Sequence, residues 1–234
     1  MMVLLPIVAG AFFVEAVTGF GATVIAVAIG GAVMPIRELL PALVPVNLAL
    51  SLALVSKDLE AVDRRLLFGR VLPLMLAGFP VGALAFRWLG ARAGALEVVF
   101  GVFVVAVAVL RLLGATIRGG PATLALAGVV HGAFGTGGPL AVMALSGLDK
   151  RAFRATLSAL WALLSCALLT SYALAGSLGV ESLTRSLWLS PAMLVGLGLG
   201  QIVHARLDPG RFRVAADALL LVAGGVLLAR TLGR

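Results

Sequence analysis

The chain has 234 residues, of which 62% are apolar and 12% are charged, whereas an average soluble domain is about 45–50% apolar and about 25% charged. This composition excludes a disordered chain and argues against an ordinary soluble domain, because long apolar runs are typical of helices that span a bilayer. The 18 basic and 10 acidic residues give a net charge of +8. The basic residues lie in short gaps between apolar runs, where they orient a membrane protein and do not indicate a nucleic-acid partner. Alternating ten-residue strands are absent, so we expect an all-α integral membrane protein and not a barrel.

Eight apolar segments follow one another along the chain. They cover residues 3–34, 39–56, 66–89, 94–113, 121–147, 152–176, 183–205 and 212–232. The longest polar stretch, Ser56 to Arg65, is too short for a soluble domain, so any activity is expected inside the membrane part. The N-terminus lacks the basic region of a signal peptide, so we expect the first segment to stay in the protein. The single cysteine, Cys166, allows neither an internal disulfide nor a cysteine metal site.

The eight segments form two sets of four. Residues Glu15 to Gly21 align with His131 to Gly137 at an offset of 116, and the alignment pairs two glycines of each stretch. Pro73-Leu-Met-Leu-Ala-Gly78 aligns with Pro191-Ala-Met-Leu-Val-Gly196 at an offset of 118. The matches occur in the same order in both halves, which indicates a duplication. We therefore predict one membrane domain made of two repeats, residues 1–114 and 121–234.

The first and fifth segments differ from the others. Each is about 30 residues long and is interrupted by a glycine cluster, Gly19-Phe20-Gly21 in the first and Gly135 to Pro139 in the fifth. Glycine and proline weaken a helix, and about 20 residues make one crossing. Each segment is thus too long for one ordinary span and too short for two. Two interpretations stay open: a bent or unwound crossing, or a re-entrant hairpin with the glycines at its tip.

The basic residues distinguish these two topologies. If all eight segments cross, nine basic residues lie on each side, with Arg37 and Arg92 opposite Arg185 and Arg230. If the two broken segments re-enter, one side holds only Arg37, Arg87, Arg92, Arg185, Arg230 and Arg234, and the other twelve basic residues share the opposite side. The second distribution obeys the positive-inside rule and places both termini outside. A hairpin followed by three crossings is an odd unit, so we favour inverted repeats, which recur in transporters.

The paired glycine-broken segments, each followed by a helix rich in small residues, resemble the TauE/SafE family of sulfite and organosulfonate permeases. The residues that carry the resemblance are Gly19-Phe20-Gly21 and Gly135-Thr136-Gly137-Gly138-Pro139, with the stretches Pro41 to Asn47 and Arg154 to Ser158 that follow them. Through the duplication, the resemblance covers nearly the whole chain. The first half departs from the pattern, because Ala22-Thr23 stand where the second half has Gly138-Pro139. The resemblance implies transport of a small sulfur-containing anion, such as sulfite, sulfoacetate or another organosulfonate, or thiosulfate, or of a related carboxylate.

An anion inside a membrane needs hydrogen-bond donors that add no unpaired buried charge. Backbone N–H groups at the N-terminus of a broken helix supply them, and glycine lets the backbone approach the ligand closely. Threonine hydroxyls can add further donors. The candidate substrate-binding residues at the two breaks are Thr18, Gly19, Phe20, Gly21, Thr23, Gly135, Thr136, Gly137 and Gly138. Close helix packing, for which membrane proteins also use small residues, is the alternative explanation.

Glu15 and His131 occupy matching positions one helical turn before the glycines, inside apolar runs. A carboxyl group within a membrane is costly and is a functional candidate by default. Burial disfavours its charged form, so it can carry a proton. We predict that Glu15 couples transport to protons and that His131 either relays protons or donates a hydrogen bond to the substrate, and we hypothesise that the two residues face each other across the repeat axis. The alternatives are a glutamate at the level of the headgroups and a histidine that only packs.

Segments 2 and 6 carry a second set of polar residues. An offset of 114 places Asn47 on Trp161 and Ser51 on Ser165, and the four-residue spacing puts each pair on one helix face. With Ser158, these are candidate substrate-binding residues, although hydrogen bonds between helices would explain them equally well. Gln201 and His204, near the end of segment 7, are weaker candidates, and Asp217 in segment 8 is expected to pair with Arg213.

The sequence thus predicts a secondary transporter of a small anion, coupled to protons, in the inner (plasma) membrane of a prokaryote. No phosphate-binding loop of the Gly-x-x-x-x-Gly-Lys-Ser/Thr type occurs, so ATP hydrolysis is not expected, and neither is a cofactor or a metal. The expected partners are the anion, the bilayer and a second copy of the chain. The alternatives are an anion channel or a carboxylate transporter of the same fold, a structural subunit, and an intramembrane enzyme, for which the sequence has no Gly-x-Ser-x-Gly elbow.

Overall fold

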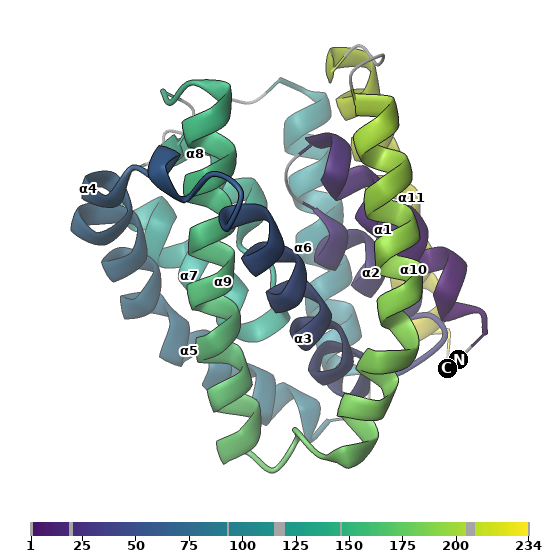
Figure 1. Cartoon of the computed structure of the whole chain (residues 1–234). Coiled ribbons are helices and arrows are strands. Elements are labelled where there is room, and N and C mark those ends of the chain that lie inside the picture. Colours follow the sequence, from purple (N-terminus) through teal and green to yellow (C-terminus); the bar gives the residue numbers. More distant parts are fainter. Residues whose placement is uncertain are drawn as a thin grey trace. The chain divides into compact units, whose positions relative to one another are not determined.

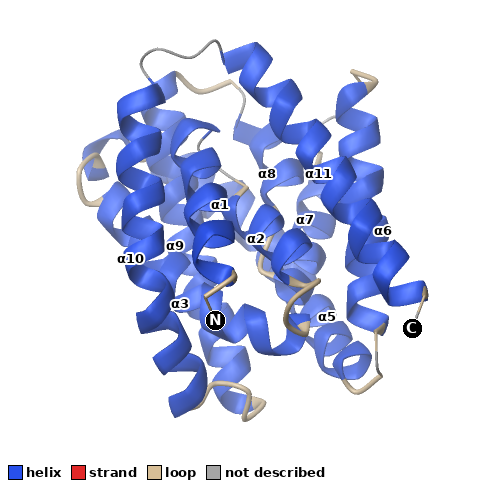
Figure 2. Ribbon diagram, turned by 90° about the vertical axis from the view of Figure 1, so that its right-hand side faces the viewer, coloured by secondary structure: helices blue, strands red, loops and turns tan. Residues whose placement is uncertain are grey.

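The computed structural model describes residues 2–18, 21–92, 94–114, 120–145, 147–204 and 209–233. Every regular element within these ranges is a helix (Figure 2). The elements are α1 (Leu4–Thr18), α2 (Ala22–Gly30), α3 (Ile36–Val55), η1 (Leu59–Ala61), α4 (Arg64–Leu66), η2 (Leu67–Val71), α5 (Leu72–Gly90), α6 (Ala95–Leu112), α7 (Pro121–Phe134), α8 (Gly138–Leu145), α9 (Lys150–Leu174), α10 (Val180–His204) and α11 (Pro209–Leu232). The predicted all-α fold is confirmed.

In the part of the chain that the structure describes, five helical stretches are long and apolar enough to cross a bilayer. They are Ile36–Val55, Arg64–Gly90, Ala95–Leu112, Lys150–Leu174 and Val180–Val203, which correspond to the predicted segments 2, 3, 4, 6 and 7. Large apolar side chains are exposed on them, among them Leu84, Trp88, Leu187, Trp188 and Leu194. Apolar surface of this extent is typical of helices that face lipid. The architecture is that of a multi-pass α-helical membrane protein.

The helices gather into two compact units, each of which draws on both halves of the sequence. Unit 1 comprises Met1–Leu40, Trp88–Thr116 and Thr184–Arg234, and unit 2 comprises Pro41–Arg87 and Ile117–Leu183. Unit 1 therefore contains α1, α2, α6, α11 and most of α10, whereas unit 2 contains α7, α8, α9 and most of α3 and α5. Each unit holds one of the two glycine-broken segments.

In unit 1, α1 and α2 form a hairpin, drawn in purple in Figure 1. A Cβ atom added to Gly30, at the end of α2, would be 3.3 Å from a methyl carbon of Leu4, at the start of α1. The two helices therefore run antiparallel, and they pack against each other. Gly21, at the turn, has φ 110°, a conformation that favours glycine. With 15 residues, α1 is about 22 Å long at 1.5 Å per residue, which is shorter than the hydrocarbon core of about 30 Å.

The second broken segment folds back in a similar way in unit 2. Gly135 ends α7 in the left-handed region, with φ 64°, and its N–H donates to the carbonyl oxygen of His131 at 2.7 Å. Gly137 precedes α8 and lies against α7, where an added Cβ atom would be 2.5 Å from the carbonyl oxygen of Ala127 and 2.9 Å from Cε of Met75. Glycine is therefore required here by the turn and by close packing.

Polar contacts within unit 1 distinguish the two topologies that the sequence left open. Arg230 Nη1 donates to the carbonyl oxygen of Ala32 at 3.0 Å, and Arg185 Nη1 donates to Glu38 Oε2 at 3.0 Å. Both arginines thus lie at the end of the unit where α3 begins, beside Arg37. A chain that crossed the membrane in all eight segments would place both of them on the face opposite Arg37. The contacts therefore favour the hairpin topology.

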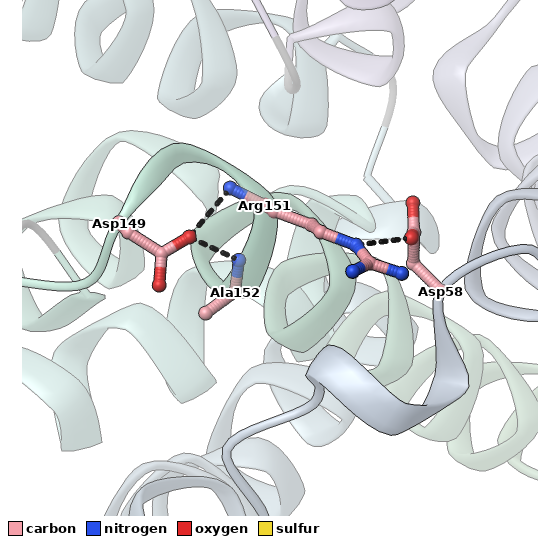
Figure 3. A network of polar contacts seen from close by, with 4 residues as sticks. All are labelled: Asp58, Asp149, Arg151 and Ala152. Carbon is pink, nitrogen blue, oxygen red and sulfur yellow. Dashed lines mark hydrogen bonds and ion pairs between the residues drawn. The ribbon is translucent and has the colours of Figure 1, made fainter.

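A contact within unit 2 gives the same result at the start of α9 (Figure 3). Arg151 Nε lies 2.6 Å from Asp58 Oδ1, and the N–H of Asp63 donates to Thr156 Oγ1 at 2.9 Å. Asp149 caps α9, because its Oδ1 accepts the N–H of Arg151 at 2.9 Å and of Ala152 at 3.1 Å. The polar loop before α4 therefore lies at the N-terminus of α9. Eight crossings would separate Asp58 from Arg151 by the whole membrane.

Each hairpin packs closely against a long helix from the other half of the sequence. In unit 1, a Cβ atom added to Gly196 of α10 would overlap the carbonyl oxygen of Ala9 in α1. In unit 2, a Cβ atom added to Gly78 of α5 would overlap the carbonyl oxygen of Ala125 in α7. The two contacts are equivalent under the offsets of 118 and 116 that the sequence suggests.

Candidate functional site

The N-terminus of α2 in unit 1 holds a carboxylate from its own chain. Glu15 lies in the last turns of α1 and is only 6% exposed. Its Oε2 accepts the N–H of Ala22, the first residue of α2, at 2.7 Å across the hairpin turn. The preceding residue, Gly21, has no side chain that could cap the helix. A negative charge at this position is favourable, because the free N–H groups and the helix dipole make the N-terminus positive.

The matching position in unit 2 holds a histidine with no such bond. His131 is 1% exposed, and its ring stacks on the indole of Trp161 in α9, with centroids 5.5 Å apart and planes 4° apart. Neither Nδ1 nor Nε2 has a hydrogen-bond partner among the described residues. A neutral imidazole has one donor and one acceptor nitrogen, so both capacities are left for a ligand or water. The two breaks thus present different chemistry.

Buried polar atoms without a partner gather in unit 2. Within the described ranges they are Asn47 Oδ1, His131 Nδ1 and Nε2, Ser165 Oγ and Tyr172 OH, and every one of these residues belongs to unit 2. Native proteins leave few such groups unsatisfied, and each needs an explanation. Asn47, His131 and Ser165 were singled out by the sequence. Ser165 lies four residues after Trp161 on α9, so the two side chains share the face that meets His131.

Tyr172 is the residue that the sequence analysis missed. It is buried, its ring lies 5.3 Å from that of Phe86, and its hydroxyl has no partner in the described part of the chain. The available signal was its spacing: it lies seven residues after Ser165, two helical turns along the same face of α9. A single tyrosine in the whole chain, placed in an apolar run, was a second signal.

The other predicted site residues divide into three groups. Thr23, Ser51, Thr136 and Ser158 are buried, as are the backbones of Gly135, Gly137 and Gly138. Gly19, Phe20 and the side chain of Thr18 lie outside the described residues, and so does the side chain of His204. Gln201 is exposed. The positive φ angles of Gly21 and Gly135 follow from the hairpin turns and Gly137 packs closely against α7, so these glycines do not by themselves require a ligand.

Asp217 forms an ion pair in unit 1. Its Oδ1 lies 2.9 Å from Nε of Arg111, so the ion pair links α11 to α6. The aspartate side chain is 5% exposed. Arg213, the partner expected from the sequence, has a side chain outside the described residues. No group of three or more His, Cys, Asp or Glu side chains that could hold a metal ion occurs in the part described.

The two hairpins place the N-termini of the short helices α2 and α8 inside compact units. The N-terminus of α2 contacts a carboxylate, and the unit that contains α8 also contains the buried polar atoms that have no partner among the described residues. Such an end can bind an oxyanion through N–H groups. Comparison with known proteins bears on this chemistry. No curated protein and no solved structure gives a significant match. Residues 4–227, which include both hairpins, match the family model described as sulfite exporter TauE/SafE. The chain therefore belongs to this family of membrane transporters, which export sulfite and related sulfur anions.

Proposed function

We propose that this protein is a secondary transporter that carries a small sulfur-containing anion, sulfite or an organosulfonate, across a prokaryotic inner membrane and couples its movement to protons. The observation that carries the proposal is the set of buried side chains in unit 2 that have no partner among the described residues, which includes His131 and Ser165. Buried polar groups that make no hydrogen bond lower the stability of the folded protein. A fold that retains them has a use for them outside its own packing.

In this proposal, unit 2 supplies one set of substrate-binding groups. The N-terminus of α8, at Thr136, Gly137 and Gly138, offers backbone N–H groups to the oxyanion. The Ser165 hydroxyl and a ring N–H of His131 supply side-chain donors, and Trp161 fixes the imidazole plane by stacking at 5.5 Å. Asn47 and Ser51 on α3 and Ser158 on α9 extend the polar lining. Neutral donors suit this task, because they bind an anion without a buried positive charge that would stay unpaired in the empty site.

Unit 1 plays a different part, because Glu15 already holds the N-terminus of α2. The carboxylate stands where a substrate anion would bind, at 2.7 Å from the Ala22 N–H. Taking up a proton removes that negative charge, which leaves the end of α2 attractive to an anion. Glu15 is therefore the proposed proton-coupling residue. Thr18, Gly19, Phe20, Gly21 and Thr23 are the neighbouring residues that would meet the anion.

A channel and a carboxylate transporter of the same fold remain the competing functions. A carrier gives flux that saturates and is stimulated by substrate on the opposite side, whereas a channel gives neither. A carboxylate carries two acceptor oxygens in one plane, whereas sulfite presents three oxygens in a pyramid, so competition between the two ions separates the substrates. Exchange of labelled sulfite against unlabelled sulfite, thiosulfate or acetate makes both distinctions in one assay.

The decisive experiment makes two measurements on the Ser165→Ala variant: the flux of labelled sulfite in proteoliposomes, and the thermal unfolding temperature of the same preparation. Removing an unsatisfied buried hydroxyl leaves stability unchanged or raises it, while loss of one donor to a charged ligand slows flux at low sulfite by about tenfold. Thr170→Val is the matched control on α9, since the Thr170 hydroxyl is exposed and bonds to the Cys166 carbonyl oxygen of its own helix at 2.9 Å.

The proton-coupling proposal has its own variant. Glu15→Gln keeps an oxygen that can accept the Ala22 N–H but cannot gain or lose a proton, so flux should persist and lose its response to a pH gradient. Glu60→Gln, at an exposed position in η1, is the control. Unchanged pH-sensitive flux in Glu15→Gln would contradict the coupling role. Normal sulfite flux in Ser165→Ala together with lower stability would show that Ser165 serves the fold and not the substrate.

A further inference from the structure

A cavity of unit 1 lies at the end of the unit where α3 begins and α11 ends. It has a volume of about 660 Å³ and is lined by the turn after α2, the first turn of α3, the α5–α6 turn and the last turns of α11. Three lining residues are arginines, Arg37, Arg92 and Arg230, and one is an acid, Glu97. Three guanidinium groups against one carboxylate give the cavity a net positive charge. None of the residues proposed for substrate binding lines it.

Two of the three guanidinium groups are held in place by contacts that leave donors available. Arg230 Nη1 donates to the carbonyl oxygen of Ala32 at 3.0 Å, which uses one of the five N–H donors of the group. Arg92 lies over the face of the Trp88 indole, with Cζ 3.4 Å from the ring centroid. Stacking occupies the flat face of a guanidinium and leaves its N–H edges exposed. Arg37, in the first turn of α3, makes no hydrogen bond within the described residues.

The single acid in the cavity is engaged with the backbone. Glu97 Oε1 accepts the N–H of Ile36, the first residue of α3, at 3.0 Å. The carboxylate thereby caps α3, where a negative charge is favourable. No side-chain ion pair between Glu97 and the three arginines occurs among the described contacts. The guanidinium groups therefore keep donors for an external oxyanion.

The surroundings of the cavity are those of a membrane surface. Trp88 stands in the last turn of α5 and is 62% exposed, and Val33 at the rim is 48% exposed. Tryptophan concentrates at the level of the lipid headgroups, where its ring is partly in hydrocarbon and partly in water. Leu227 and Leu96 are buried and give the cavity an apolar floor. The expected ligand thus combines a negatively charged oxyanion with an apolar chain.

We propose that this cavity binds the phosphate of an anionic phospholipid, with Arg37, Arg92 and Arg230 as its donors and the acyl chains against the apolar surface beside Trp88. Guanidinium groups bind phosphate oxygens in pairs through parallel N–H bonds. Basic pockets between membrane helices bind headgroups of this kind. The same guanidinium groups would also bind free phosphate or sulfite, so the test must distinguish a lipid headgroup from a soluble oxyanion.

The experiment titrates the delipidated, detergent-purified full chain with phosphatidylglycerol, phosphatidylcholine or inorganic phosphate and follows the thermal unfolding temperature. Phosphatidylglycerol should raise the unfolding temperature of the unaltered protein. In Arg37→Gln and in Arg92→Gln, the phosphatidylglycerol concentration that gives half of the maximal rise in unfolding temperature should increase about fivefold. Arg37→Gln is the safer variant, since its side chain supports no described contact. Arg87→Gln, at an exposed arginine of α5 that does not line the cavity, should behave as the unaltered protein does.

Three results would overturn the proposal. An equal rise with phosphatidylcholine would show that the negative charge is irrelevant. An equal phosphatidylglycerol response in Arg37→Gln, Arg92→Gln and Arg87→Gln would show that the lipid binds elsewhere. An equal rise with inorganic phosphate, weakened in the two cavity variants, would assign the cavity to a soluble oxyanion and remove the lipid.

Discussion

Replacing Glu15 by alanine should destabilise the protein, and a small external carboxylate should restore much of the loss. The side chain makes a hydrogen bond of 2.7 Å to the Ala22 N–H in a site where Glu15 is only 6% exposed. A hydrogen bond to a charged group contributes about 1.5–3 kcal/mol, and the buried N–H left behind would lack an acceptor. Removing the carboxylate also removes the cost of burying it, so we expect a net loss of about 2 kcal/mol.

For a chain of this length, 2 kcal/mol corresponds to a fall in Tm of about 4–8 °C. The truncated side chain also leaves space beside a helix N-terminus that attracts anions. Formate fits that space and supplies the missing oxygen. At ten times its dissociation constant it should return about 1.4 kcal/mol to Glu15→Ala.

The assay is thermal unfolding of the purified protein in detergent, followed by circular dichroism, with and without formate. Glu60→Ala, at an exposed acid in unit 2, is the control for general effects of charge and salt. The reasoning is refuted if Glu15→Ala melts at the same temperature as the unaltered protein. It is also refuted if formate raises the Tm of both proteins equally, because the rise would then not depend on the site left by Glu15.

Three further predictions rest on single contacts. Gly196→Ala should cost at least about 3 kcal/mol or prevent folding, because the added methyl group would overlap the Ala9 carbonyl, whereas Gly198→Ala on the same helix has open space and should be neutral when unfolding is compared. Asp217→Asn should lower the free energy of unfolding by about 3 kcal/mol, because it removes the negative charge that lies 2.9 Å from Nε of Arg111 and is only 5% exposed; a loss below about 1 kcal/mol, the size typical of an exposed ion pair, would contradict this reasoning. Tyr172→Phe should raise the free energy of unfolding by about 1 kcal/mol in a denaturant titration, because its hydroxyl is buried and has no partner in the part of the chain that the structure describes, and a loss of stability would reveal a hydrogen bond.

The breaks in the two long segments could be predicted because the backbone conformation at their tips favours one residue type. Gly21 and Gly135 have φ 110° and φ 64°, and glycine adopts these values at little cost. The preference for a hairpin over a crossing came mainly from the distribution of basic residues, in which Arg185 and Arg230 share a side with Arg37 only if the broken segments re-enter. It was accessible because charges rarely enter the hydrocarbon core, so their side of the membrane can be counted.

Contacts that depend on how helices meet could not be predicted. Glu15 reaches Ala22 across a turn, a seven-residue separation that no helical spacing indicates. Asp217 pairs with Arg111 because α6 packs on α11, and local spacing, which indicates only residues three or four positions away, could not predict this contact between two helices. Packing also decides that Glu15 accepts the N–H of Ala22 while the ring nitrogens of His131 have no partner among the described residues, although the two residues align in the sequence.

The close contact of α1 with α10 has a consequence for how the protein is made. Gly196 packs against Ala9, which lies near the opposite end of the chain. The hairpin of α1 and α2 leaves the ribosome first, and α10 is synthesised only after most of the chain has followed. At 5–20 residues per second the delay is roughly 10–40 s. During that time α1 lacks α10, the long helix whose glycines pack against it, and a chaperone or the insertion machinery would have to hold the hairpin. Changes in the small residues of α10 should therefore lower the yield of correctly inserted protein as well as the stability of the folded chain.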